Sequence, residues 1–245
     1  MLQLYDKIGT TYAEYRRPDP HIAAHIMAAL GDAETIVNVG AGTGSYEPKD
    51  RNVVAVEPSE TMIRQRARDA APVVRASAMN LPFRDDAFDV ALAVLTVHHW
   101  PDQVRGCLEM ARVSKRSIFL TWEPCDTPSW LTRDYFPEIL ANDLKVFPAV
   151  ESFYEPLFKK ITIRTIAIPH DCTDGFLEAY WRRPEAYFDA GVRGAISSFA
   201  YLADVERRLT RLRRDLQDGT WSRRNSDLLN RTELDLGYRL VVAEP

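Results

Sequence analysis

The sequence predicts an α/β protein with an open, mostly parallel β-sheet, and three observations carry this prediction. A short apolar run at residues 36–39 breaks into three glycines at alternate positions between 40 and 44. A second apolar run at 52–56 ends in an acid, Glu57. Beyond it, apolar runs alternate with stretches of helical periodicity, which is typical of parallel strands joined by crossover helices.

The glycine loop and the acid indicate a nucleoside-containing cofactor. Glycine has no Cβ, so the loop can adopt left-handed dihedral angles and a ligand can lie against the bare peptide. An acid at the tip of the second strand is where such sheets hold both hydroxyls of a ribose. We therefore expect Gly40, Ala41, Gly42 and Glu57 to bind the cofactor.

The glycine spacing favours S-adenosylmethionine (SAM) over a dinucleotide. The dinucleotide fingerprint is Gly-x-Gly-x-x-Gly, followed by a helix whose N-terminus holds the pyrophosphate. Here the spacing is Gly-x-Gly-x-Gly, the link at 45–51 is short and contains a proline, and Glu47 stands where a pyrophosphate would lie. Such a loop suits an uncharged linkage beside a ribose.

Four motifs follow one another over residues 36–102. They are Val-Asn-Val-Gly-Ala-Gly-Thr-Gly at 37–44, Val-Ala-Val-Glu-Pro-Ser at 54–59, Leu-Pro-Phe-Arg-Asp-Asp-Ala-Phe-Asp-Val at 81–90 and His-His-Trp-Pro-Asp at 98–102. In this order they resemble the class I SAM-dependent methyltransferases, in the type 11-like branch that acts on small molecules. The resemblance extends to about residue 122. It implies a Rossmann-like, doubly wound, mostly parallel seven-stranded sheet with an antiparallel last strand, and S-adenosylhomocysteine as product.

The remaining elements are placed by periodicity and end signals. Asp19 and Pro20 fit the N-cap and first-turn preferences of a helix that Gly31 ends. A second helix begins at Ser59, and a third spans residues 101–113. We predict the further strands at residues 73–76, 88–94, 117–122, 161–168 and 238–243.

Two longer segments flank the last strands. The segment 125–150 is rich in proline and aromatic residues, which predicts an irregular lid with one short helix. From Asp174 to about Gly219 the periodicity is helical, with one break at 181–184 and a second helix at 197–219. We predict that residues 1–245 form a single domain with a helical cap over the site. Its parts are a helical lead-in at 1–31, a cofactor-binding core at 36–122 and the cap at 170–220.

The resemblance implies further cofactor contacts. In methyltransferases of this kind a lead-in segment closes over the cofactor, and a tyrosine or arginine reaches its carboxylate, which implies Tyr12 and Arg17, with Arg16 as the alternative to Arg17. An apolar side chain one turn into the next helix lies against the adenine, which implies Met62 after Pro58.

Adenine recognition departs from the pattern of the family. An acid is common at the position of Ser77, where it accepts from the adenine amino group. A serine accepts without charge assistance, so recognition also rests on the backbone at Ala78 and Met79. Val94, at the end of the fourth strand, completes the expected cofactor site.

Histidines are the candidate catalytic residues, because imidazole accepts a proton near neutral pH. His98 and His99 follow the fourth strand at the mouth of the site, and His170 follows a later strand. An alternative of equal weight is that His98 and His99 only satisfy backbone groups at 101–102. The expected substrate-binding residues are Tyr5, Trp100, Glu123 and Trp130.

Composition narrows the classes of function. The formal net charge of -4 disfavours a nucleic-acid partner, which normally selects a basic surface. No apolar run approaches membrane-spanning length and the N-terminus lacks a signal-peptide h-region, so we expect no membrane partner. The three cysteines are far apart without metal-ligand spacing, which predicts no metal and a cytoplasmic location.

The sequence therefore predicts an enzyme that transfers the methyl group of SAM to an oxygen, nitrogen or carbon atom of a small molecule. The alternatives are an enzyme that uses SAM without methylation, such as one that cyclises the cofactor, and a nucleotide-dependent reductase. A third alternative is a non-catalytic module that binds SAM or its product as a signal.

Overall fold

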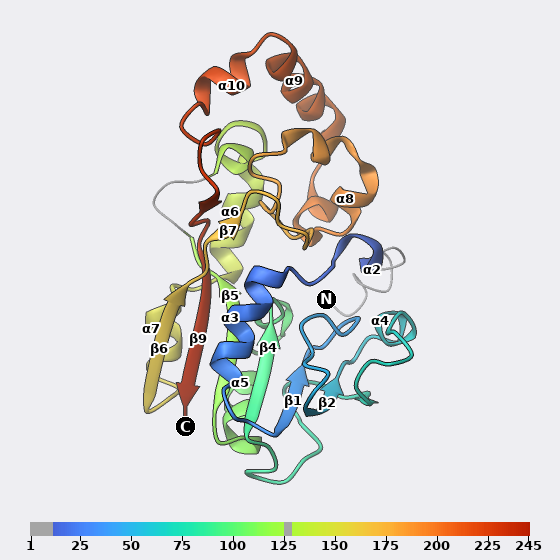
Figure 1. The fold of residues 1–245 in the computed structure, drawn as a ribbon, viewed down its shortest axis with the longest axis vertical. Coiled ribbons are helices and arrows are strands. Elements are labelled where there is room, and N and C mark those ends of the chain that lie inside the picture. Colours follow the sequence, from blue (N-terminus) through green and yellow to red (C-terminus); the bar gives the residue numbers. More distant parts are fainter. Residues whose placement is uncertain (1–11, 125–128) are drawn as a thin grey trace.

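The computed structural model describes residues 12–124 and 129–245, so the expected substrate contact of Tyr5 lies outside the described residues. A β-sheet forms one half of the molecule, and a group of helices lies beyond the carboxyl ends of its parallel strands (Figure 1). No helix in the described part of the chain is long and apolar enough to cross a membrane.

The sheet has the strand order β3-β2-β1-β4-β5-β9-β6, and β9 alone runs antiparallel to its neighbours. This confirms the predicted seven-stranded, mostly parallel sheet with an antiparallel last strand. The strands are β1 (Thr35–Val39), β2 (Asn52–Val56), β3 (Val73–Val74), β4 (Val90–Val94), β5 (Ser117–Trp122), β6 (Lys160–Thr165) and β9 (Tyr238–Glu244).

The strand order reverses at β1. β2 and β3 lie on one side of β1, and β4 and β5 lie on the other, all four parallel to it. The loops that leave β1 and β4 therefore part in opposite directions. In open α/β sheets the crevice for a ligand opens at this point, at the carboxyl ends of the strands.

Helices cover both faces of the sheet. α3 (Pro20–Leu30) buries Ile22 and Ile26 against one face, and α5 (Gln103–Val113) and α7 (Val150–Tyr154) cover the other. The Asp19 carboxylate caps α3 by accepting from the backbone N–H groups of the first turn. The short helices α2 (Tyr12–Tyr15) and α4 (Glu60–Arg64) lie near the carboxyl ends of β1 and β2 (Figure 1).

The helices beyond the sheet form a second layer with its own aromatic core, which includes Trp130, Tyr187 and Trp221. The two-stranded pair of β7 and β8 lies between this layer and the sheet (Figure 1). The elements are η3 (Leu131–Tyr135), α6 (Pro137–Val146), β7 (Ile168–Pro169), η4 (Pro184–Phe188), α8 (Ala190–Gly194), η5 (Ser197–Tyr201), α9 (Val205–Gln217), α10 (Thr220–Arg224) and β8 (Glu233–Leu234).

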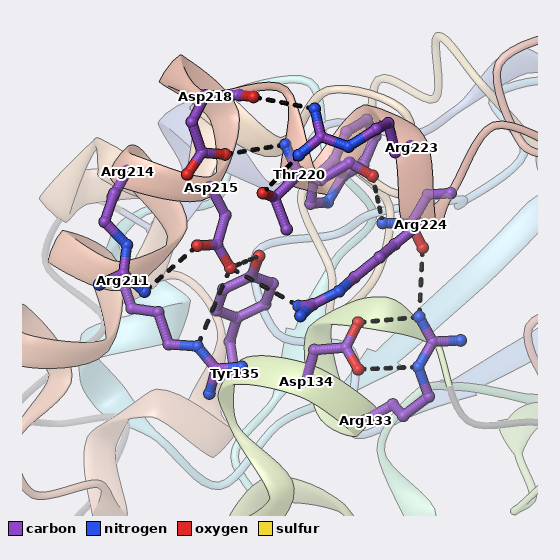
Figure 2. A network of polar contacts seen from close by, with 12 residues as sticks. Arg133, Asp134, Tyr135, Arg211, Arg214, Asp215, Asp218, Thr220, Arg223 and Arg224 are labelled. Atoms are coloured by element: carbon purple, nitrogen blue, oxygen red, sulfur yellow. Dashed lines mark hydrogen bonds and ion pairs between the residues drawn. The ribbon is translucent and has the colours of Figure 1, made fainter.

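A polar network centred on Asp215 ties this layer together, as Figure 2 shows. The Asp215 carboxylate accepts a hydrogen bond of 2.9 Å from the hydroxyl of Tyr135. Three guanidinium groups surround the same carboxylate at 3.4–3.9 Å, those of Arg211, Arg214 and Arg224. Asp215 is 4% exposed, and its charge is compensated by cations from α9 and α10.

The prediction of one continuous second cap helix at 197–219 is wrong. η5 and α9 are separate, because Asp204 adopts the left-handed conformation with φ of 55° and interrupts the helical hydrogen bonds. The stretch 174–183 contains turns in place of the predicted helix.

Other boundaries also differ from the expectation. The predicted strand 161–168 ends at Thr165, and Ile168–Pro169 pairs instead with Glu233–Leu234. The described part of the lid segment is more helical than expected, since η3, α6 and the start of α7 lie within it. The sequence predicted a largely irregular lid here, whereas a proline in the first turn of α6 favours the start of a helix.

Candidate cofactor and acceptor sites

The glycine loop after β1 holds a conformation that needs glycine. Gly40 has φ of 70°, and a Cβ added there would lie 2.2 Å from Oγ1 of Thr96. The loop is fixed to the end of β2, because the Val56 carbonyl accepts from the backbone N–H groups of Gly40 and Ala41. The bare peptide surface predicted from the sequence is therefore present beside the neighbouring strand.

Glu57 lies next to this loop at the end of β2 and is 7% exposed. Its Oε2 accepts from the Gly42 N–H at 2.8 Å, and its Oε1 accepts from the Ser59 N–H at 2.8 Å. Two backbone donors stabilise the ionised carboxylate and fix its orientation. Each oxygen accepts more than one hydrogen bond, so the group can also accept from the two hydroxyls of a ribose.

A first cavity of about 340 Å³ lies over the glycine loop and Glu57. It brings together all the expected cofactor-binding residues except Arg17, which is exposed and does not line it. Arg16 lines the cavity in its place. The expected residues found in the lining are Tyr12, Gly40, Ala41, Gly42, Glu57, Pro58, Met62, Ser77, Ala78, Met79 and Val94.

The residues of the first cavity fit SAM, and Asn38 gives the sharpest test. Its side-chain oxygen is buried without a hydrogen-bond partner, while its amide nitrogen donates to Glu47. An acceptor left open in a cavity wall calls for a donor from a ligand, and an α-ammonium group supplies one. Sequence reasoning missed Asn38, which reads as an ordinary member of a buried strand.

The charges near this loop also fit a ligand without phosphates. Glu47 is paired with Arg66 through contacts of 2.8 Å, so the charge of that guanidinium is already neutralised. The side chain of Met62 offers an apolar surface beside Gly42, where a Cβ would lie 3.4 Å from its methyl carbon. Adenine is planar and largely apolar on its faces, which suits this wall.

Arg16 belongs to a buried network that joins the lead-in segment to the rest of the protein. Its Nε donates to Asp174 at 2.6 Å, and another guanidinium nitrogen donates to the hydroxyl of Tyr12 at 2.7 Å. The Tyr46 hydroxyl of the glycine loop donates to the second oxygen of Asp174 at 2.9 Å. Asp174 thus holds the lead-in segment and the loop together over the first cavity.

A second cavity, of about 300 Å³, adjoins the first. Residues of α6, η5 and the stretch 176–177 enclose it together with the side chains of Trp122 and Tyr238, at the ends of β5 and β9 that face this layer. Its wall is largely aromatic and apolar, and it includes Asp143. Arg16, Leu95 and His99 line both cavities and form their common boundary.

The two adjacent histidines take different positions at this boundary. His99 lines both cavities and His98 lines the second, where its ring lies 4.4 Å from that of Phe147 between centroids. Burial, followed by the charge of Arg16, lowers the pKa of His99 to about 3. Burial and the neighbouring His99 hold the pKa of His98 well below its usual value. Both rings are therefore neutral at neutral pH, and they act there as hydrogen-bonding groups rather than strong bases.

The other expected catalytic and substrate residues lie elsewhere, so their positions do not support a role in either cavity. His170 is half-buried beside β8, where its backbone N–H donates to Thr232, and it lines neither cavity. Glu123 pairs with Arg239 at 2.7 Å and lines neither cavity. Trp130 is buried in the helical core, where its indole N–H donates to the Trp181 carbonyl at 2.7 Å.

Trp100 lies in the wall of the first cavity, and not in the second as expected of a substrate contact. Its ring packs onto α5 at Gly106, where a Cβ would lie 2.3 Å from a ring carbon. Among the described residues no group of three histidine, cysteine or acidic side chains is placed to hold a metal ion. Cys107 and Cys172 are buried free thiols.

Comparison with known proteins identifies the family. The model of the methyltransferase domain family matches residues 37–120. A solved structure from Anabaena variabilis, described as a methyltransferase from an antibiotic biosynthesis pathway, superimposes with a TM-score of 0.88 and is 31% identical, over 95% of this chain and 100% of that one. The chain belongs to the class I SAM-dependent methyltransferases.

Curated relatives match over a smaller share of their length. Demethylmenaquinone methyltransferase of Corynebacterium kroppenstedtii is 31% identical over 137 residues, which are 52% of this chain and 60% of that protein. A tRNA (carboxymethyluridine(34)-5-O)-methyltransferase of Schizosaccharomyces pombe is 23% identical over 127 residues, 49% of this chain and 56% of that protein. The chain thus spans little more than half the length of these relatives.

Proposed function

We propose that this protein transfers the methyl group of SAM to a small molecule held in the second cavity. The observation that carries the proposal is the common boundary of the two cavities at Leu95, His99 and Arg16. A cofactor in the first cavity and an acceptor in the second meet at this boundary. SAM supplies a methyl group on a positively charged sulfur. A lone pair of the acceptor would attack the methyl carbon, and the carbon–sulfur bond would break to leave S-adenosylhomocysteine.

The residues of the first cavity divide the binding of SAM between them. Glu57 accepts from the ribose hydroxyls, and Met62 and the turn 77–79 surround the adenine. Asn38 accepts from the α-ammonium group, and the guanidinium of Arg16 attracts the carboxylate. Tyr12 covers this end, because Arg16 donates to its hydroxyl.

The main task of the protein in this reaction is orientation. The aromatic walls of the second cavity fix the acceptor and exclude water, and placement of two reactants in line can contribute about 7–11 kcal/mol in favourable cases. His99 is neutral at neutral pH because of its lowered pKa. Its imidazole can hold the nucleophile by a hydrogen bond, and it receives a proton only as the transfer makes the nucleophile acidic.

Incubation of the protein with SAM and a fractionated metabolite extract tests this proposal, with mass spectrometry of the products. We expect one class of metabolite to gain one methyl group as S-adenosylhomocysteine accumulates, and the Glu57→Gln variant to lose most of that activity at low SAM. Consumption of SAM alone, with a cyclised product, would indicate the cofactor-cyclising alternative and contradict methyl transfer.

Methylation of tRNA is the second candidate, because several curated relatives carry that activity in their names. The volume of the second cavity, about 300 Å³, favours a small molecule, and so does the formal net charge of -4 of the chain. Incubation with total tRNA and radiolabelled SAM separates the two. Label retained in tRNA, and absent from small molecules, would contradict the proposal.

A further inference from the structure

The second cavity contains a buried acid, Asp143, to which the described part of the chain offers no cationic partner. Asp143 lies on α6, is 8% exposed and lines the second cavity. Among the described residues no lysine, arginine or histidine forms an ion pair with it. Its side chain hydrogen-bonds to Ser198 on η5, which is a neutral partner. A buried carboxylate usually has a cation nearby, because burial of an isolated charge is costly.

We propose that the acceptor carries a protonated amine and that the Asp143 carboxylate binds it. This inference rests on the proposed function, since it names the substrate class of the same site. An ammonium group would give Asp143 the charge partner that residues 12–124 and 129–245 do not supply, and it would donate hydrogen bonds to an acid that accepts them.

The walls around Asp143 suit a cation as well. Trp122, Phe147, Phe176, Tyr201 and Tyr238 contribute aromatic rings to the second cavity. The face of an aromatic ring attracts a cation through its negative quadrupole. Aromatic walls and the carboxylate of Asp143 together form a site that favours an organic ammonium group over a neutral group of the same shape.

The charges near Asp143 also favour a cationic acceptor over an anionic one. Glu178, a second buried acid, raises the pKa of Asp143 by its charge, in addition to the larger effect of burial. Two acids near one end of the cavity repel an anionic acceptor. Arg16, which also lines the cavity, lies at the common boundary and is paired with Asp174.

The position of Asp143 also indicates which part of the acceptor it binds. Asp143 lines the second cavity and not the first, whereas His99 and Leu95 line both. The ammonium group therefore lies away from the methyl donor. A protonated nitrogen has no lone pair for attack, so the methylated atom belongs to another part of the acceptor, next to His99.

Calorimetric titration of the full chain saturated with S-adenosylhomocysteine tests this inference. The probes are two matched pairs, tyramine with 4-hydroxyphenylethanol and tryptamine with tryptophol, in which only the ammonium and hydroxyl groups differ. We expect at least one amine to bind about tenfold or more tightly than its alcohol. The Asp143→Asn variant should lose this preference, and Glu138→Gln, on the exposed side of the same helix, should keep it.

Equal affinities within both pairs, absence of binding by all four probes, or an unchanged preference in Asp143→Asn would overturn the inference. Titration of the same preparations with SAM shows which proposal has failed. If the wild-type protein binds SAM but shows no preference for the amines, only the role of Asp143 is contradicted. If the wild-type protein does not bind SAM, the proposed function is contradicted. If Asp143→Asn fails to fold, titration of the wild-type protein at several pH values replaces it. The affinity for the amines should rise between pH 5.5 and 8 as Asp143 ionises, while the affinity for the alcohols stays constant. An amine affinity that does not depend on pH would overturn the inference.

Discussion

The guanidinium of Arg16 and the carboxylate of Asp174 form a buried ion pair with an Nε–Oδ1 distance of 2.6 Å across 158 residues of sequence. Asp174 is 1% exposed and also accepts from Tyr46 of the glycine loop. The backbones of Arg16 and Asp174 form a bridge at the same place. This pair therefore fixes the lead-in segment over the first cavity and places Arg16 at the boundary of both.

Replacement of Asp174 by asparagine should lower both stability and SAM affinity. Loss of one partner of a buried ion pair leaves an uncompensated charge and costs about 3–5 kcal/mol. Chemical denaturation and SAM calorimetry measure the two effects. As the control, Lys160→Ala breaks the exposed pair with Glu244 and should cost about 1 kcal/mol or less. Equal effects of the two variants would contradict the structural role of Asp174.

Substitution of Gly40 by alanine should destabilise the protein and abolish SAM binding. The new Cβ would collide with Thr96 at 2.2 Å, and the left-handed backbone at φ of 70° costs a further 1–2 kcal/mol, roughly, in a residue with a Cβ. Gly194→Ala is the matched control, because nothing lies within 4 Å of a Cβ there. Thermal denaturation compares them, and a Gly40→Ala protein as stable as Gly194→Ala would contradict this geometry.

The contribution of Asp143 and Glu178 to the stability of the protein should fall as pH rises toward 7. Burial raises the pKa of Asp143 to about 7 and that of Glu178 to about 7, so these two groups bind more protons in the folded than in the unfolded state between about pH 4 and 7. The stabilisation by the protonated acids is fully present at pH values below their pKa in the unfolded state. It is lost as the pH rises through their pKa in the folded state. Asp143→Asn should therefore be more stable than the wild type at pH 8, on the order of 2–4 kcal/mol, and much less so at pH 4. Denaturation at both pH values measures this, and a difference independent of pH would contradict the burial of an ionisable Asp143.

His98 and His99 should remain neutral throughout the range from pH 5 to 8. Burial depresses both pKa values, that of His99 to about 3. NMR of the imidazole protons measures this directly, with His99→Gln to assign the signals. Ring signals of His98 or His99 that titrate near pH 6.5 would show that the boundary of the cavities is accessible to water.

The fold was largely predictable because its signals are local. The apolar runs of β1, β4 and β5 and the end signals of α3 each lie within a few residues, and each predicts its element without knowledge of the rest. The same holds for Gly40 and Glu57, since the glycine turn and the acid at a strand end are read from short motifs. The break at Asp204 was missed, because a left-handed aspartate between two helical stretches leaves no change in apolar periodicity.

The second cavity was not predictable, because its residues meet only through the tertiary fold. Arg16 and Arg17 are equivalent in the sequence, and Asp174 decides which of them faces inward. Trp130 and Trp122 are likewise both aromatic residues near the end of β5, yet one fills the helical core and the other lines the second cavity. Asp143 reads as a solvated helix position until η5 packs over it.

Calorimetric titration of SAM into the wild type, Glu57→Gln and Glu60→Gln tests the central claim most directly. Glu57 lines the first cavity with both oxygens fixed by backbone donors, while Glu60 lies exposed at the start of the next helix. The account predicts that Glu57→Gln weakens SAM binding by about tenfold or more, because hydrogen bonds to an ionised acceptor are lost, and that Glu60→Gln binds as the wild type does. Unchanged affinity in Glu57→Gln would contradict it.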